Sequence, residues 1–453
     1  MTLEAETATG EGAAPKGKWG PYGRRPLVVL CLIGLVDAVD RGVLPGVIEL
    51  VKDDLGLSDF QAGLLSSAIV VATLLVAVPG GLLADRRDRR TLMAIVLCLW
   101  SAATALSAGV RSFPQLFAVR SLLGVGDAIN DPAAQSLVAD YYPPAVRGRA
   151  YGWQRVVPTA GVAVGAVVGG VLGEAFGWRV AVLAVALPGL VVAVMVRRLP
   201  LPERGASDLP SVTATGAPPT LLPSQASPVL APLSTRQSLM ACLRVPSLRA
   251  LLFATSITTA SLAALGFWGI AYHQRASGLS ASKAAAVAGG AILVGAIIGG
   301  FGGGVLADRL RGRVKGAALL LGACTTAAGT VLLLLSFNDG IPVYGVRLPL
   351  QVLAVALIVA ALPALTAMTT EVVRPHLRGT AFGLLKLFAN LFAALTPPLI
   401  GFIADTRQIT VDGEETGDLG FAFRWTVWAV LLGSALLLYG RRHVEEDVRA
   451  ASA

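Results

Sequence analysis

Three formal charges interrupt an apolar stretch near the start of the chain. The stretch reads GLVDAVDRGVLP over residues 34–45 and contains Asp37, Asp40 and Arg41. Charges inside a membrane are costly, and they mark ion, proton or substrate pathways. Asp37 and Arg41 are four residues apart, so they can pair along one helix face. Burial and a neighbouring arginine act on the pKa of a carboxyl group in opposite directions, which makes an exchangeable proton possible.

A second charged pair occurs in RSLLGVGDA, residues 120–128. Arg120 and Asp127 are seven residues apart and therefore lie on one face of a helix. At 1.5 Å per residue, Asp40 and Asp127 both reach a depth of roughly 20 Å from where their helices enter a hydrocarbon core about 30 Å thick. Because the two helices run in opposite directions, both carboxylates are expected near the middle of the membrane.

The amino-acid composition indicates that these charges lie in a membrane protein. Of the 453 residues, 55% are hydrophobic and 14% are charged, whereas soluble proteins carry about 25% charged residues. Apolar stretches long enough to span a membrane recur, without the alternation of a β-barrel. Since the basic residues lie mostly in short loops, the net charge of +9 indicates topology rather than nucleic-acid binding. No His or Cys cluster suggests a metal, a cofactor or an enzyme.

We therefore expect an all-α polytopic membrane protein with about twelve transmembrane helices in two six-helix bundles. The expected spans are 26–49, 60–84, 91–110, 115–139, 149–173, 179–197, 248–272, 284–307, 315–336, 346–372, 378–403 and 420–440. The expected organisation is a disordered tail (1–25), an amino-terminal bundle (26–197), a linker (198–247), a carboxy-terminal bundle (248–440) and a second tail (441–453).

The loops indicate an orientation and an internal repeat. Arginines and lysines gather in alternate loops, so the positive-inside rule places both termini and the linker in the cytoplasm. GGLLADRRDRR at residues 80–90 recurs as GGVLADRLRGR at residues 303–313. Two parallel six-helix repeats are typical of alternating-access transporters, whose substrate site lies between the repeats near the midplane. We expect a monomer in the cell membrane, with membrane lipids, a proton and a small molecule as partners.

The segment 80–90 resembles the loop motif G-x-x-x-D-R-x-G-R-R of the major facilitator superfamily. Within it, DAVDRGVLPGV and RSLLGVGDA resemble the first and fourth helices of the Spinster family. In the superfamily the motif's Asp pairs with an Arg and a helix terminus to lock one conformation, and Asp85 is expected to pair near Arg149 or the start of the eleventh span. The candidate loop-latch residues are Gly81, Asp85, Arg86, Arg90, Arg149 and Asp308.

Superfamily folds place the first and fourth helices beside the central cavity, so the resemblance implies that the buried charges meet in one polar cluster. The candidates for proton coupling are Asp40, Asp127 and Asp37, with Asp40 preferred and Asp37 regarded as structural. The candidates for substrate binding are Arg41, Arg120, Asn130, Lys386 and Asn390. The resemblance further implies secondary active, proton-coupled transport of an amphipathic lysophospholipid or sphingolipid type of substrate.

Several alternatives remain open at this stage. The buried charges could form a static ion-pair network that only fixes helix packing, and the substrate could be a drug or a small organic anion. Lys386 could line the site with Asn390 or extend toward the cytoplasm. The residues that end the seventh span could contact the substrate, but they are assigned to an interfacial aromatic belt; they are Phe267, Trp268, Tyr272 and His273. Import or export, symport or antiport, stoichiometry, the conformational state and the carboxylate that carries the proton are not determined.

Overall fold

The computed structural model describes residues 19, 22–86, 88–200, 202, 234–310, 313–338, 340–374, 377–411 and 413–452. The first bundle comprises α1 (Arg25–Leu55), α2 (Asp59–Arg86), α3 (Arg89–Ser107), α4 (Phe113–Tyr141), α5 (Pro144–Phe176) and α6 (Trp178–Arg197). The second comprises α8 (Pro246–Ser277), α9 (Ala281–Leu310), α10 (Ala317–Ser336), η1 with α11 (Val343–Arg347, Leu348–Glu371), α12 (Arg378–Asp405) and α13 (Leu419–Arg441). The prediction of twelve long helices in two bundles is confirmed.

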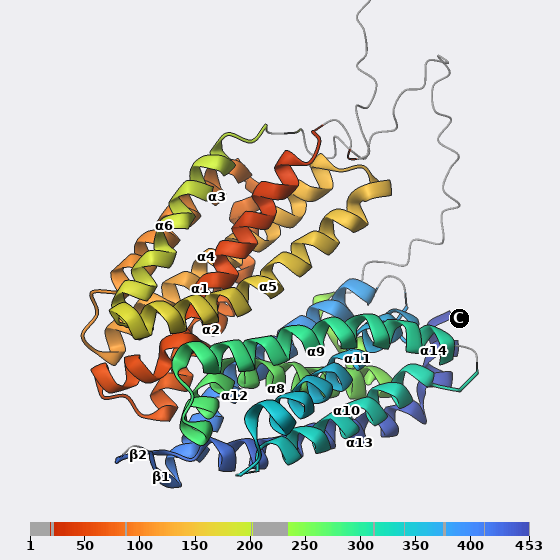
Figure 1. The fold of residues 1–453 in the computed structure, drawn as a ribbon. Helices are drawn as coiled ribbons and strands as arrows, with labels where there is room; N and C mark the ends of the chain where they lie inside the picture. The colour runs from red at the N-terminus through yellow and green to blue at the C-terminus, as the bar shows by residue number, and fades with distance from the viewer. Residues whose placement is uncertain are drawn as a thin grey trace, which may run out of the picture.

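The two bundles form a V in projection (Figure 1). They meet where a hairpin of β1 (Gln408–Val411) and β2 (Glu414–Gly417) follows α12. They diverge toward the end from which the chain leaves α6 and where the C-terminus lies. We call these the hairpin end and the linker end. The bundles contact each other mainly through α2 with α12 and α5 with α9. The opening between them therefore faces the linker end.

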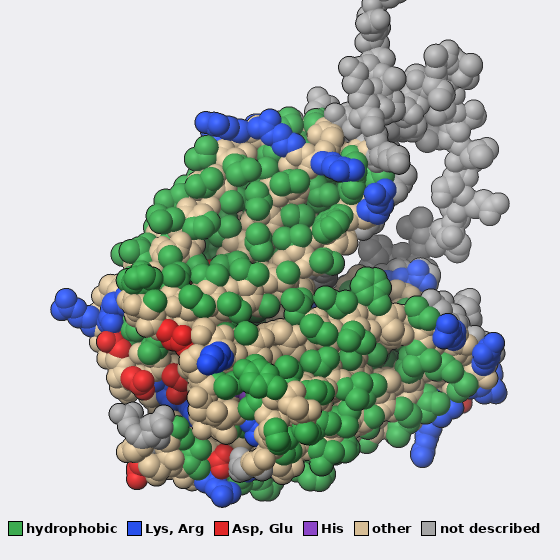
Figure 2. All heavy atoms as spheres, viewed as in Figure 1, with side chains coloured by type: hydrophobic (Ala, Val, Ile, Leu, Met, Phe, Trp, Pro, Cys, Tyr) green, Lys and Arg blue, Asp and Glu red, His purple; other side chains and the backbone are tan. Residues whose placement is uncertain are grey.

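Figure 2 shows hydrophobic side chains covering the flanks of both bundles, with charged side chains gathered near the ends. Ten helices among the described residues are long and apolar enough to cross a membrane. The other two long helices of the bundles, α1 and α4, contain the buried charges noted in the sequence. The protein is thus a multi-pass membrane protein in which two helices carry most of the intramembrane charge.

Glycines bring α1 and α5 into backbone contact. A Cβ atom at Gly165 would overlap the carbonyl oxygen of Val39, and one at Gly42 would overlap the carbonyl oxygen of Val162. Small residues at helix interfaces allow this approach in membranes, where apolar surface alone gives little driving force for association. The glycine spacing in α5 therefore fixes α1, which carries Asp37, Asp40 and Arg41, against its neighbour.

Three short elements differ from the sequence-based expectation. Residues 235–244 of the expected linker form α7 (Thr235–Arg244), which begins with a capping box at Ser234 and buries Cys242. The expected tail forms α14 (Val444–Ser452), where Asp447 accepts a hydrogen bond from the N–H of Ser247 at the start of α8. The β-hairpin was not expected. Residues 203–233 of the linker lie outside the described residues.

Candidate functional site

Arg41 on α1 lies between two carboxylates. Its Nε donates to Oδ1 of Asp37 at 2.8 Å, and its Nη2 donates to Oδ2 of Asp127 on α4. The side chain of Arg41 is 41% exposed, whereas that of Asp127 is 8% exposed. Asp131, one turn further along α4, is close enough to Arg41 to interact electrostatically with it. These four side chains form the Arg41 group.

Asp40 belongs to a separate, buried group. Its carboxylate accepts hydrogen bonds from Nη1 of Arg120 at 3.4 Å and from the hydroxyl of Thr104 on α3 at 3.2 Å. Arg120 is 1% exposed. A cavity of about 10 Å³ adjoins Asp40 and is lined by residues of α1, α3 and α6, including Trp100 and Ser101. Its volume is close to the minimum that one water molecule requires.

The expected single cluster is therefore divided into two groups. Asp127 pairs with Arg41, and Arg120 pairs with Asp40. The reason is helical geometry: with 3.6 residues per turn, neighbours such as Asp40 and Arg41 point about 100° apart. Asp40 thus faces the inside of the first bundle, while Asp37, expected to be structural, lies in the more exposed Arg41 group.

Lys386 on α12 approaches the Arg41 group from the second bundle. Its Nζ lies 4.0 Å from Oδ2 of Asp131, and both side chains are about 70% exposed. The lysine therefore faces the opening between the bundles. Asn390 is half-buried one turn further along. Asn130 is buried, and neither atom of its side-chain amide has a hydrogen-bond partner among the described residues.

The expected loop latch falls largely on side chains that the structure does not describe. These are Gly81, Asp85, Arg86 and Asp308, so the expected pairing of Asp85 lies outside the described part of the chain. Arg90 donates to the carbonyl of Leu199 at 2.5 Å and lies 3.6 Å from Asp88. Arg149 is exposed and places its guanidinium 4.8 Å from the ring centre of Trp19.

Asp88, between α2 and α3, caps the start of α3. Burial raises the pKa of the Asp88 carboxyl, but this effect is outweighed by hydrogen bonds, which hold its pKa below the ordinary value. The donors are the Thr91 hydroxyl at 2.7 Å and the backbone N–H of Arg90 at 3.0 Å. Asp88 stands where the superfamily loop motif has its second glycine, and its local structural role is that of a helix cap.

Sequence reasoning missed two polar groups near the hairpin end. Arg275 on α8 binds Glu49 and Asp59 of the first bundle. Tyr272 and His273 do not form an interfacial belt: both are buried, and His273 Nε2 lies 3.0 Å from Oε1 of Gln351. The sequence did not indicate these contacts, because the partners of His273 and Arg275 lie 78 and 226 residues away along the chain.

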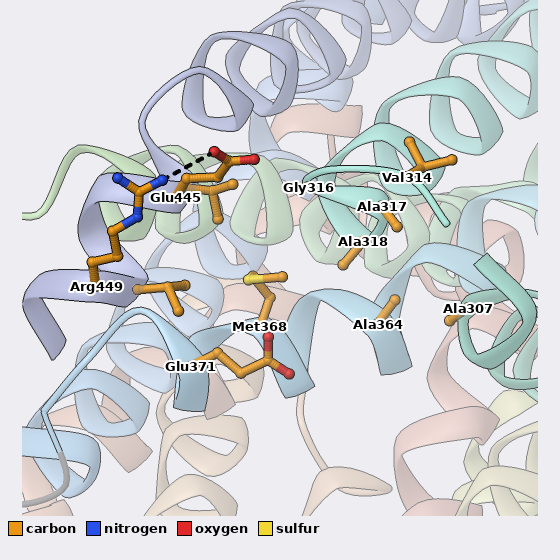
Figure 3. Close-up of a pocket in the computed structure, with 12 residues that line it drawn as sticks. Ala307, Val314, Gly316, Ala317, Ala318, Ala364, Met368, Glu371, Glu445 and Arg449 are labelled. Carbon is orange, nitrogen blue, oxygen red and sulfur yellow. Dashed lines mark ion pairs between the residues drawn. The ribbon is translucent and has the colours of Figure 1, made fainter. Parts of the chain in front are cut away.

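A cavity of about 490 Å³ opens at the linker end of the second bundle (Figure 3). Met368 and Glu371 of α11 lie on one side of it, and Glu445 and Arg449 of α14 lie on another. Small residues such as Ala364 line the rest. The cavity belongs to the second bundle alone, so it is not the space between the bundles in which the Arg41 group faces Lys386.

The model of the Major Facilitator Superfamily matches residues 30–397, and the chain belongs to that superfamily. Its members are transporters rather than enzymes. A relative over nearly the whole length is Protein spinster homolog 3 of Danio rerio, which is 27% identical over 94% of this chain and 86% of its own. The chain thus resembles the Spinster family, as its first and fourth helices predicted.

A second relative and a solved structure are also similar to this chain. The niacin transporter NiaP of Acinetobacter baylyi is 32% identical over 183 residues, which cover 40% of this chain and 42% of its own. A bacterial homologue of the human lysosomal transporter Spinster, in an inward-facing and unoccupied conformation, has a similar fold. It has a TM-score of 0.76 and 22% identity over 95% of this chain and 97% of its own.

Proposed function

We propose that this transporter moves an amphipathic, lipid-like substrate of lysophospholipid or sphingolipid type, coupled to a proton, by alternating access. The observation that carries the proposal is the Arg41 group. A half-exposed guanidinium, held by Asp37 and Asp127, lies near the opening between the bundles, which Lys386 faces from the other side. An anionic headgroup fits the two cations, and an apolar tail fits the largely uncharged second bundle.

In this proposal, transport is coupled to a proton because the anionic substrate competes with the carboxylates for Arg41. Three carboxylates, those of Asp37, Asp127 and Asp131, face two cations, Arg41 and Lys386. An anionic substrate that binds Arg41 deprives a carboxylate of its partner, and a partly buried carboxylate without a partner favours its neutral form. Proton and anionic substrate therefore promote each other's binding. Asp127 and Asp37 are the proton carriers in this scheme, in place of Asp40.

The first prediction concerns this coupling. In proteoliposomes loaded with substrate, Asp127→Asn is expected to abolish the dependence of transport on a pH gradient, because the amide cannot exchange a proton. Asp37→Asn is expected to reduce that dependence. Asp54→Asn is the matched control, since Asp54 also lies on α1 but pairs with Arg179 at 2.7 Å, away from the Arg41 group. Full gradient dependence in both site variants would contradict the proposal.

A second candidate function is proton-coupled transport of a small organic anion or a drug. The similarity to a niacin transporter favours this candidate, because the relative carries a small molecule rather than a lipid. An uptake panel of lysophospholipids, small organic acids and cationic drugs in proteoliposomes distinguishes the two. Transport of organic acids without lysophospholipids would replace the lipid proposal and retain the role of Arg41.

We further propose that the protein acts as a monomer in the cell membrane, with both termini in the cytoplasm. The distribution of arginines in the loops of the sequence supports the orientation. In this orientation the opening between the bundles faces the cytoplasm, and the hairpin end faces outward.

A further inference from the structure

Arg275 at the hairpin end joins the two bundles through several hydrogen bonds and ion pairs. Its Nε and Nη2 donate to Glu49 on α1 at 3.2 and 2.8 Å. Its Nη1 and Nη2 donate to Asp59 on α2, both at 2.7 Å, and Nη1 also donates to the carbonyl of Gly417 in β2 at 2.8 Å. All five N–H groups of the guanidinium are therefore satisfied.

The charges around Arg275 balance. Lys52 forms an ion pair with Asp59 and lies 3.7 Å from Glu49, so two cations meet two carboxylates. The Arg275 side chain is 4% exposed and the Asp59 side chain is 1% exposed. Removing one partner from a buried, satisfied ion pair leaves an uncompensated charge and is strongly destabilising. This network therefore favours the arrangement in which it is intact.

Two more carboxylates cross between the bundles at the same end. Asp405, at the end of α12, accepts hydrogen bonds from the N–H groups of Asp59 and Phe60 at 3.1 and 2.9 Å. Glu174, near the end of α5, accepts from the N–H and the hydroxyl of Ser282 at 2.9 and 2.8 Å. The first N–H groups of a helix have no partner within that helix. Each carboxylate thus caps a helix of the opposite bundle.

The two caps follow the internal repeat of the chain. α5 and α12 are the fifth long helices of their bundles, and α2 and α9 are the second. In both directions the fifth helix of one bundle caps the second helix of the other. The arrangement is a symmetric pair of caps beside the single Arg275 network, and we call the whole set the hairpin-end clasp.

We infer that the hairpin-end clasp holds the transporter closed at this end and must separate once in every transport cycle. Arg275 is a positioning residue in this inference. It touches no substrate, but it determines whether the space between the bundles is closed at the hairpin end. The inference rests on the alternating access of the proposed function, but it does not depend on the identity of the substrate or on the proton.

A comparison with the contact between the bundles toward the linker end supports the inference. Toward the linker end, the pair of Lys386 and Asp131 also crosses between the bundles, but at 4.0 Å and with both side chains about 70% exposed. Exposed ion pairs contribute little to stability. The buried clasp therefore biases the equilibrium toward closure at the hairpin end, and weakening it should populate the alternative arrangement.

The test measures the distance between the bundles at the hairpin end in the full-length protein. Spin labels are placed at Phe176 and Gln408, which are exposed and belong to opposite bundles, after replacing the exposed cysteines Cys98 and Cys324 by alanine. Double electron–electron resonance then reports the closed and open populations. Arg275→Gln is expected to raise the ratio of open to closed molecules about tenfold, the change that about 1.4 kcal/mol produces.

Arg179→Gln is the matched control. Arg179 lies at the same end and pairs with Asp54 at 2.7 Å, but both residues belong to the first bundle. This control should leave the distance distribution unchanged. An equal shift in Arg179→Gln and Arg275→Gln would overturn the inference, because it would show a general loss of rigidity.

The caps provide a test that does not disturb the buried charges. Glu174→Ala and Asp405→Ala should each shift the populations toward opening by less than Arg275→Gln does. Glu174→Gln, which keeps an acceptor oxygen, should restore part of the closed population. Unchanged distributions in both alanine variants and in Arg275→Gln would overturn the inference. If Arg275→Gln does not fold, the two cap variants decide the question.

Discussion

Arg41 and Arg120 are both candidates for substrate binding in the sequence, but their surroundings in the structure differ. Arg41 is half-exposed and shared between two carboxylates, whereas Arg120 is enclosed in the first bundle with Asp40. A shared, accessible cation can exchange partners when a ligand arrives. An enclosed pair instead fixes the helices that carry it. The distinction makes different predictions for the two arginines.

Replacing Arg120 by glutamine should mainly reduce stability. The variant leaves Asp40 buried without its ionic partner, a loss of about 3–5 kcal/mol for a buried pair. Arg41→Gln should cost less stability, because Arg41 is partly solvated, but should abolish substrate binding. Thermal unfolding in detergent, combined with ligand-induced stabilisation, separates the effects. Equal destabilisation by both variants would contradict the assignment.

Lys386 is expected to strengthen the binding of an anionic substrate from the second bundle. Lys386→Gln should weaken binding about fivefold, the effect of roughly 1 kcal/mol for a partly exposed charge. Lys315→Gln is the control, since Lys315 also belongs to the second bundle and forms an exposed ion pair, with Glu445 at 3.3 Å. A titration that follows thermal stabilisation measures both. An undiminished affinity in Lys386→Gln would remove this residue from the site.

The sequence did not identify the partners of the charged residues. The count of residues from the membrane entry predicts that Asp40 and Asp127 lie near the middle of the membrane, and in the structure both side chains are buried among protein atoms. Which arginine each one meets depends on the rotation of α1 relative to α4, and no pattern within either helix defines it. Arg275 was overlooked because a basic residue near a helix end is ordinarily solvated or interfacial.

At the scale of elements, the contact between α1 and α5 determines the position of the charged groups. Glycines recur every four residues from Gly161 to Gly173 in α5, a spacing that allows close packing, and the structure shows that the partner is α1. The hairpin and α14 were not predictable to the same degree. Both are short, polar segments that are stabilised by contacts with distant parts of the chain, such as Asp447 with Ser247.

Gly165→Ala should destabilise the first bundle. The added Cβ would overlap the Val39 carbonyl, and relief requires a shift of α1 that costs about 1–3 kcal/mol, the range for overpacked sites. Gly152→Ala is the control on the same helix, because nothing lies within 4 Å of a Cβ at that position. The control should be neutral or slightly stabilising, since alanine favours helix over glycine. Thermal unfolding of both variants checks the difference.

At the scale of the whole molecule, the two-bundle architecture follows from the internal repeat, and the twelve helices were predicted from apolar spans. The asymmetry between the bundles also has an origin in the sequence: α1 and α4 carry charged residues in their central parts, whereas the charged residues of the corresponding helices α8 and α11 lie near the helix ends. The arrangement of the bundles relative to each other was not predictable, because it depends on contacts such as the hairpin-end clasp.

The proposed orientation is tested by access to the two ends of the chain. Epitope tags attached at either terminus should be reached by antibody only after the membrane is permeabilised. A cysteine introduced at Gln408 in the exposed hairpin should react with a membrane-impermeant maleimide in intact cells. Labelling of the termini in intact cells would contradict the proposed orientation. The opening between the bundles would then face the outside of the cell.

The hairpin that follows α12 has a consequence for inhibition. Gly417, at the end of β2, accepts a hydrogen bond from Arg275, and the paired strands extend from Gln408 to Gly417. A protein reagent, such as an antibody fragment, that bridges this hairpin and the turn between α1 and α2 would hold the bundles together at that end. In the proposed orientation it would arrest the cycle from outside the cell without competing with the transported molecule, so its potency would not depend on substrate concentration.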